Sequence, residues 1–113
     1  MMRRRIVLSA ALRAEYVHLF ATCVVRRERE AEVERIVERI AANRTRYEAI
    51  AHETGVPWGV VAVVHQMEAG LRFDRHLHNG DPLTARTVRV PSGRPREGAP
   101  PFTWEESATD ALR

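Results

Sequence analysis

The chain has 113 residues, of which 44% are hydrophobic and 29% are charged. This length predicts one domain, and the composition excludes an intrinsically disordered chain. The 18 basic residues, all arginine, are interleaved with 15 acidic ones, and the net charge of +3 favours a solvated mixed surface over a nucleic-acid partner. The single cysteine, Cys23, excludes an intramolecular disulfide framework.

The N-terminal segment begins with the arginines at positions 3–5 and continues with an apolar stretch at 6–12. This stretch is barely long enough for the core of a signal peptide and no clear cleavage site follows it, so we expect cytoplasmic synthesis without a signal peptide. No apolar run approaches the length of a membrane span. Apolar residues at helical spacing predict a first amphipathic helix over 9–25, within an N-terminal helical region of residues 1–26, and they place Cys23 on its buried side.

A second, charged amphipathic helix is predicted for residues 28–54. Its apolar stripe follows helical spacing, at Val33, Ile36, Val37, Ile40, Ala41, Tyr47 and Ala51. Arginine and glutamate cover the other face, and their alternating signs are typical of a solvated helix surface. Gly55 stands just past the end of this helix, where a residue with left-handed backbone is favoured.

A third helix is predicted for residues 57–69. Pro57 suits the first turn of a helix, and Gly70 suits its end. The side chains between them are apolar nearly all round the helix, including four valines. Such a helix has no solvent face, so we expect it to be the central, buried helix of the fold.

The helical pattern of apolar residues ends at Gly70, and residues 70–101 are predicted to form a β and loop region. The sequence Asn-Gly-Asp-Pro at 79–82 is a strong turn signal. Alternating β-branched residues predict a short strand over 84–91, and the proline-rich stretch at 92–101 predicts a loop.

A last helix is predicted to begin with a capping box. Thr103 is the cap, and Glu106 reaches back to its backbone N–H. The helix predicted for 103–113 has barely begun when the sequence reaches Arg113, so we expect a domain truncated at its C-terminus.

Glu68 is the acid at the end of the apolar third helix. The negative end of the helix dipole and an apolar surrounding both favour its protonated form. A carboxylic acid that keeps its proton near neutral pH is suited to general acid catalysis. The other interpretation is a solvated side chain at the point where the helix emerges from the fold.

The densest polar cluster of the chain follows Glu68. It consists of Asp74, His76, His78, Asn79 and Asp81. The two histidines are two residues apart and share one side of an extended segment. Three interpretations stay open: a metal site with an aspartate as third ligand, a substrate-binding loop opposite the acid, or a turn whose side chains cap their own backbone. The spacing matches no zinc signature.

Other catalytic patterns are weaker. Ser9, Ser92 and Ser107 lack the context of a nucleophile elbow, which argues against a serine hydrolase. No glycine-rich phosphate loop is present, and no cofactor is expected. Trp58 and Trp104 are of a type found more often in cores than as sugar platforms, although either can flank a glycan cleft.

Several stretches together resemble one family. They lie at 55–58 (Gly-Val-Pro-Trp), 63–68 (Val-Val-His-Gln-Met-Glu), 71–83 and 100–107. With them the chain resembles the peptidoglycan-lytic proteins of bacteria and phages in the lysozyme-like group, which includes goose-type lysozymes and lytic transglycosylases. The resemblance implies one mainly helical, α+β domain over 1–113, in which a buried helix ends in a catalytic glutamate and a small β-hairpin region follows. Glu68 matches that glutamate, and Ala69 stands where the group usually has serine.

The resemblance also implies a reaction. Glu68 would protonate the oxygen of the β-1,4 bond between N-acetylmuramic acid and N-acetylglucosamine. Inverting hydrolysis needs a second carboxylate that holds water, for which Asp81 is the first candidate and Asp74 the second. Without one, the N-acetyl group of the sugar shares the charge and an anhydro product forms. The implied substrate-binding side chains are Asp74, His76, His78, Asn79 and Trp104.

The implied partner is the peptidoglycan glycan strand, reached at the cell wall after release or export. Related domains close their cleft with further helices, so a partner chain or domain is expected to complete it here. Two other hypotheses stay open. One is a non-catalytic, truncated helical module that binds glycan or a partner, and the other is a zinc peptidase built on Asp74, His76 and His78.

Overall fold

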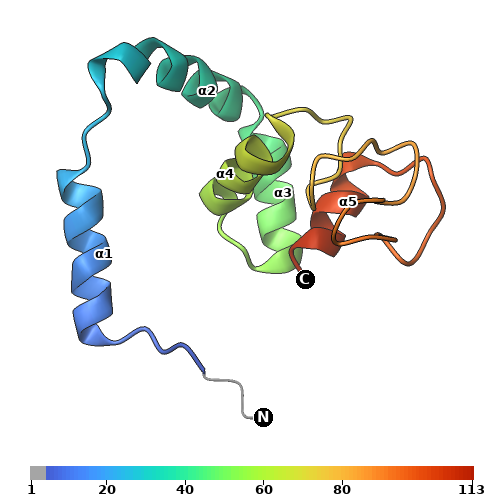
Figure 1. The fold of residues 1–113 in the computed structure, drawn as a ribbon, viewed down its shortest axis with the longest axis horizontal. Coiled ribbons are helices and arrows are strands. Elements are labelled where there is room, and N and C mark those ends of the chain that lie inside the picture. The colour runs from blue at the N-terminus through green and yellow to red at the C-terminus, as the bar shows by residue number, and fades with distance from the viewer. Residues whose placement is uncertain (1–4) are drawn as a thin grey trace. The chain divides into compact units, whose positions relative to one another are not determined.

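The computed structural model describes residues 5–113. In this part of the chain the fold is mainly helical, as predicted, and contains no sheet (Figure 1). The elements are α1 (Ala10–Thr22), the 3₁₀ turn η1 (Arg27–Arg29), α2 (Glu30–Ala42), α3 (Arg44–Thr54), α4 (Trp58–Ala69) and α5 (Trp104–Ala111). None of the described helices combines the length and apolar character that crossing a bilayer requires. The chain divides into two units, residues 1–34 and 35–113, and the single lysozyme-like domain stays a prediction.

In the first unit, α1 is capped by Ser9, whose side-chain oxygen accepts a hydrogen bond from Leu12 N at 3.1 Å. No residue of α1 is buried, and Cys23, just past its end, is an exposed free thiol. The prediction of a buried thiol is therefore wrong. Arg13, Glu15 and His18 lie among its apolar side chains, so the helix has no continuous apolar face to pack. Arg3 and Arg4 of the basic start lie outside the described residues.

The single long helix predicted for 28–54 is wrong, because the segment forms two helices that change direction at Asn43 (Figure 1). The Asn43 backbone (φ −112°, ψ 14°) leaves the helical region, and its side-chain amide donates to Arg39 O at 2.9 Å. Asparagine competes for backbone hydrogen bonds and so favours helix ends over helix interiors. After the break, Tyr47 and Ile50 of α3 are buried, whereas α2 has no buried residue.

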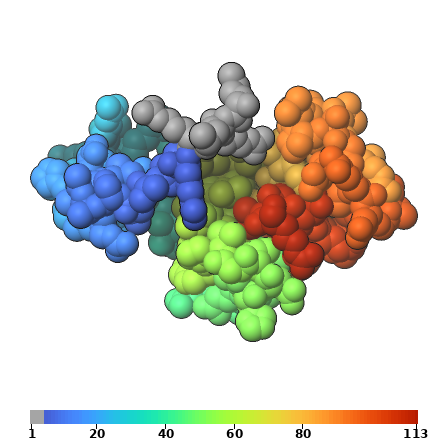
Figure 2. Space-filling view, turned by 90° about the horizontal axis from the view of Figure 1, so that it is seen from below, coloured from blue at the N-terminus to red at the C-terminus, as the bar shows by residue number. Residues whose placement is uncertain are grey.

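Helices α3, α4 and α5 build the core of the second unit, and α3 contacts both of the others. In the space-filling view α5 (red) lies between α3 (green) and the loop segment that precedes α5 (orange; Figure 2). The buried core consists of Tyr47, Ile50, Val61, Ala62, Leu77, Leu83, Phe102, Trp104 and Ala108. Since Leu77, Leu83 and Phe102 come from the segment between α4 and α5, that long segment is anchored on the helices.

Only one side of α4 is buried. Its buried residues are Val61, Ala62, His65 and Ala69. Val63 and Met67 are 54% and 76% exposed. The prediction of a central helix buried all round is therefore wrong, because α3 covers α4 from one side only. The predicted helix ends at Gly55 and Gly70 are confirmed, since both glycines adopt left-handed backbone conformations, with φ of 77° and 57°.

The segment between α4 and α5 forms no strand and no hairpin. Its β-type pairing is one isolated antiparallel bridge between Arg75 and Pro82. The strand predicted for 84–91 is wrong, because the polar groups of Thr87 are used within a local loop. Thr87 N donates to Arg94 O at 2.8 Å, and Arg94 N donates to Thr87 Oγ1 at 2.9 Å.

The predicted capping box of α5 is confirmed. Thr103 Oγ1 accepts from Glu106 N at 3.1 Å, and the Glu106 carboxylate accepts from Thr103 N at 3.2 Å. The helix that begins there carries Ser107, which is buried, and Asp110, which is partly buried. Both side chains contact the segment that follows α4, so α5 connects to the region of the predicted site.

Candidate functional site

Glu68 lies in the last turn of α4, and its side chain is exposed. The helix ends directly after it, where Gly70 N donates to Gln66 O at 3.1 Å and Leu71 N donates to His65 O at 3.3 Å. The apolar enclosure expected around this carboxylate is absent, because α4 is covered from one side only. Of the two interpretations of Glu68, the structure therefore agrees with the solvated side chain and not with the apolar surrounding, while its role as an acid stays a prediction.

A turn formed by residues 76–81, here called the 76–81 turn, packs against the backbone of Glu68. Gly80 has φ +80°, and a Cβ placed on it would lie 2.4 Å from the Glu68 carbonyl oxygen. Gly80 N donates to His76 O at 2.9 Å, and His76 N donates to Asp81 O at 2.7 Å. The 76–81 turn, which carries most of the predicted polar cluster, thus lies against the backbone of the predicted acid.

Asp81 is buried, with 6% of its surface exposed, and its carboxylate is saturated with donors. Oδ2 accepts from Val88 N at 2.9 Å and from Arg89 N at 3.0 Å, and Oδ1 accepts from Arg89 Nε at 2.7 Å. Desolvation alone would raise the pKa of Asp81, but these hydrogen bonds and the Arg89 charge outweigh it and lower the pKa to about 2. The carboxylate is therefore ionised and committed to holding the 88–89 backbone.

Asp74 is exposed and forms a bidentate ion pair with Arg72, with N···O distances of 2.7 and 3.1 Å. The hydrogen bond from Arg72 lowers the pKa of Asp74 below its usual value.

Asn79 is half-buried, and both the oxygen and the nitrogen of its side-chain amide form hydrogen bonds. Its Oδ1 accepts from Asp81 N at 2.9 Å, and its Nδ2 donates to Arg89 O at 3.0 Å. The Asx turn that the backbone-capping interpretation expects is therefore present.

His76 is fully buried and meets α5 through Ser107. Its Nδ1 lies 2.9 Å from Ser107 Oγ, and its Nε2 donates to Ala85 O at 2.7 Å. Ser107 Oγ also accepts from Leu77 N at 3.1 Å. One buried hydroxyl on α5 therefore holds both a side chain and the backbone of the 76–81 turn.

His78 joins the same network. Its side chain is 4% exposed, its Nε2 lies 2.7 Å from Asp110 Oδ2, and its Nδ1 lies 3.4 Å from Ser107 Oγ. Arg94 adds a bidentate pair to Asp110 at 3.0 and 3.1 Å. Burial lowers the pKa of His78 despite the opposing effect of Asp110. The histidines are neighbours, as their spacing predicted, with ring centroids 5.6 Å apart.

This network limits the chemistry that His76 and His78 can carry. All four of their ring nitrogens have protein partners, and no group of three metal-ligating side chains exists among residues 5–113. The order Ser107–His78–Asp110 resembles a hydrolase triad, but the serine is fully buried and beyond the reach of a substrate. The arrangement therefore supports a structural role for these side chains.

Sequence reasoning missed Ser107, Asp110 and Arg94 as members of this region. The capping box predicts where the last helix begins, and residues three apart in a helix lie on the same face. A pair of polar residues at 107 and 110, beside the apolar residues at 104 and 108, was the available signal. The loop position of Arg94 offered none, because its partner lies 16 residues away.

Trp104 is in the core rather than beside a glycan groove. It is 2% exposed, and its ring centroid lies 4.9 Å from that of Phe73 and 5.0 Å from that of His65. The Arg46 guanidinium stacks on the ring of Phe73, with its central carbon 3.8 Å from the ring centroid. The same guanidinium forms an ion pair with Glu105 at 2.7 Å. This packing excludes the side chain from stacking on a sugar.

His65, on α4, connects the same core to the segment after Glu68. Tyr47 Oη lies 2.8 Å from His65 Nδ1, and His65 Nε2 lies 2.9 Å from Arg72 O. A carbonyl can only accept, so Nε2 carries the proton and Nδ1 accepts from Tyr47. Burial is the main cause that lowers the pKa of His65, which is therefore neutral near neutral pH. The neutral His65 ring therefore holds the backbone carbonyl of Arg72, four residues beyond Glu68.

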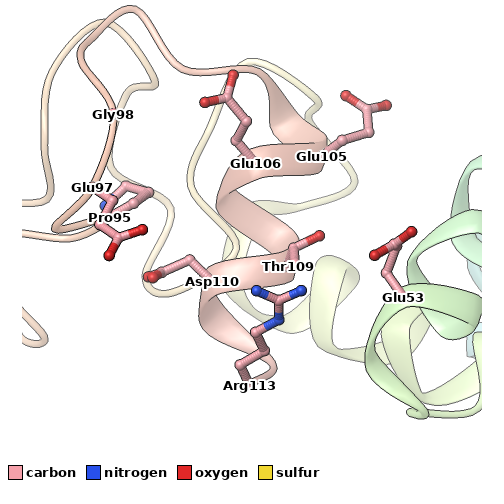
Figure 3. A pocket seen from close by; sticks show the side chains of 9 residues that line it. All are labelled: Glu53, Pro95, Glu97, Gly98, Glu105, Glu106, Thr109, Asp110 and Arg113. Atoms are coloured by element: carbon pink, nitrogen blue, oxygen red, sulfur yellow. The ribbon is translucent and has the colours of Figure 1, made fainter.

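A pocket of about 450 Å³ lies elsewhere, between α3, the 95–98 loop and α5 (Figure 3). Its lining residues are Glu53, Pro95, Glu97, Gly98, Glu105, Glu106, Thr109, Asp110 and Arg113. Glu68 is not among them. Glu105, Glu106 and Asp110 are already used, in the Arg46 pair, the helix cap and the Arg94 pair respectively. The pocket therefore adds no group to the predicted site.

No family model matches the chain, and no match was found among the curated proteins or the solved structures. The side chains of this protein alone therefore carry the functional argument. They offer an exposed acid at a helix end, a rigid polar turn against its backbone, and a second carboxylate that is fully occupied.

Proposed function

We propose that this protein cleaves the β-1,4 bond between N-acetylmuramic acid and N-acetylglucosamine in peptidoglycan, with Glu68 as the general acid of a lysozyme-like domain. The observation that supports it most is the contact between the 76–81 turn and Glu68. A general acid needs a fixed position and access to substrate. Glu68 has an exposed side chain, and a hydrogen-bonded turn lies against its backbone.

The transition state of glycoside cleavage resembles an oxocarbenium ion, so a second group must share its charge. In inverting hydrolysis that group is a carboxylate which holds water, typically about 6.5–9.5 Å from the acid. Asp81 accepts three hydrogen bonds from protein donors, and Asp74 is paired with Arg72. We therefore favour the route in which the N-acetyl group of the substrate takes this role. Glu68 gives its proton to the leaving oxygen as the C1–O bond breaks. The C6 hydroxyl of the same muramic acid then bonds to C1 and returns its proton to the Glu68 carboxylate, so the product carries an anhydro end.

Mass spectrometry of purified peptidoglycan after incubation tests the proposal. We expect fragments with anhydro ends from the wild-type protein. Glu68→Gln should fold and lose at least about 100-fold in rate, because the amide cannot donate the proton. Glu53→Gln, at a glutamate in the pocket of Figure 3, is the matched control and should retain the rate.

The outcomes separate the alternatives. Reducing ends would indicate water-dependent hydrolysis, and cut peptides would indicate a peptidase. Full activity of Glu68→Gln would contradict the role of Glu68.

The second candidate is a non-catalytic module that binds glycan or a partner. The exposed side of α4, with Val63 and Met67, favours it, and so does a pocket lining that does not include Glu68. Such a protein would sediment with sacculi and release no fragments. Wild-type protein and Glu68→Gln would then behave alike in both assays.

A further inference from the structure

We propose that Gly80 is a positioning residue for Glu68, a role that rests on the proposed function. A Cβ at position 80 would lie 2.4 Å from the Glu68 carbonyl oxygen, 3.6 Å from the carbonyl carbon and 3.9 Å from Ala69 Cα. All three atoms belong to the backbone at the end of α4. The absence of a side chain at Gly80 therefore sets how closely the turn approaches the residue that carries the acid.

The turn cannot simply withdraw from α4, because it is held from other directions. Ser107 Oγ on α5 accepts from Leu77 N at 3.1 Å. Arg75 Nη1 donates to Gly80 O at 3.0 Å. Gly80 N donates to His76 O at 2.9 Å, and this histidine is itself fully buried. A group added at position 80 would therefore push on both partners, and part of the displacement must fall on the backbone of Glu68 at the end of α4.

The size of the displacement follows from the contact distance. Cβ atoms essentially never approach other heavy atoms closer than 3.0 Å, so a contact at 2.4 Å must widen by at least about 0.6 Å. The exposed Glu68 carboxylate extends from the atoms that would move. A misplacement of about 1 Å at a catalytic group costs about 100-fold in rate. Contacts that bind the rest of a glycan strand would be affected less.

The test compares Gly80→Ala with Gly93→Ala on purified peptidoglycan. Gly93 has φ +72°, close to the +80° of Gly80, but nothing lies within 4 Å of its Cβ position. Both variants therefore carry the same backbone strain, and only Gly80→Ala carries the contact. We expect kcat of Gly80→Ala to fall about 10- to 100-fold with KM changed less than about threefold. Gly93→Ala should keep kcat within about twofold.

A second measurement does not depend on activity. NMR chemical shifts of the Glu68 carbonyl and the Ala69 amide should change in Gly80→Ala and stay constant in Gly93→Ala. If Gly80→Ala does not fold, Ser107→Ala loosens the same turn from the α5 side, and kcat should fall with KM nearly constant. Equal kcat of the two glycine variants, in an active protein, would overturn the inference. Unchanged Glu68 shifts would also overturn it.

The failure of the inference is distinguishable from that of the proposed function. An inactive wild-type protein whose Glu68 and Ala69 shifts respond only to Gly80→Ala would leave the contact established and remove the muralytic reaction. An active wild-type protein whose variants do not differ would keep the reaction and remove the positioning role of Gly80.

Discussion

Two aspartates seven residues apart show how surroundings divide one residue type into two roles. Asp81 is buried and accepts hydrogen bonds from two backbone amides and one guanidinium. Asp74 is exposed and pairs with one arginine at the surface. Buried donors that lose their acceptor cost far more than a broken surface ion pair. Asp81 is therefore part of the framework that supports the 76–81 turn.

Asp81→Asn should lower the free energy of unfolding by about 1–3 kcal/mol. The amide nitrogen of asparagine would face a backbone N–H or the Arg89 guanidinium, both of which are donors. Asp74→Asn should change the free energy by less than about 0.5 kcal/mol. Urea unfolding followed by circular dichroism measures both values. Equal midpoints for the two variants would show that the Asp81 network contributes nothing to stability.

At the scale of elements, α5 connects the core to the candidate site. Its apolar face buries Trp104 and Ala108, while Ser107 and Asp110 hold the segment that follows α4. Eight residues is a short helix, and such helices depend on their caps and on packing. The capping box at Thr103 is therefore a local feature with an effect on the 76–81 turn.

Thr103→Ala should lower the free energy of unfolding by about 1 kcal/mol, because Glu106 N loses its acceptor at the start of α5. Fraying of α5 should also speed hydrogen exchange at the Leu77 amide, which donates to Ser107. Thr84→Ala, at an exposed threonine outside any helix, is the control and should leave both measurements unchanged. If exchange at Leu77 is the same in all three proteins, α5 does not stabilise the turn.

At the scale of the whole molecule, two buried histidines couple stability to pH. Burial is the main cause that lowers the folded-state pKa of His65 and of His78 below the usual value of 6.5. The unfolded chain therefore takes up protons first as the pH falls. The contribution of both residues to stability is fully present above about pH 6.5 and is lost progressively below it.

Thermal unfolding measured from pH 8 to pH 5 should show a constant midpoint above about pH 7 and a falling midpoint below pH 6.5. His65→Gln removes one titrating group, while an amide can still accept from Tyr47 and donate to Arg72 O. Its midpoint should fall less steeply between pH 7 and pH 5 than that of the wild type. Parallel curves would assign the pH dependence to other groups.

Much of the local structure could be predicted from the sequence. Gly55 and Gly70 end helices, and Thr103 begins one, because caps act on backbone groups within four residues. The turn signal at 79–82 and the closeness of the two histidines also depend only on residues that are near one another in the sequence. The strand over 84–91 was not predictable in this way, because a strand needs a partner and Thr87 pairs with Arg94 instead.

The sequence by itself determined where the helices of the second unit begin and end, with the exception of the break at Asn43, and that an acid closes α4. Tertiary structure alone decided that Glu68 is exposed, that Asp81 is saturated, and that Trp104 is in the core. The reason is distance along the chain. His78 meets Asp110 across 32 residues, and Gly80 meets Glu68 across a folded loop. Spacing predicts which residues share a face, whereas only packing decides which faces meet.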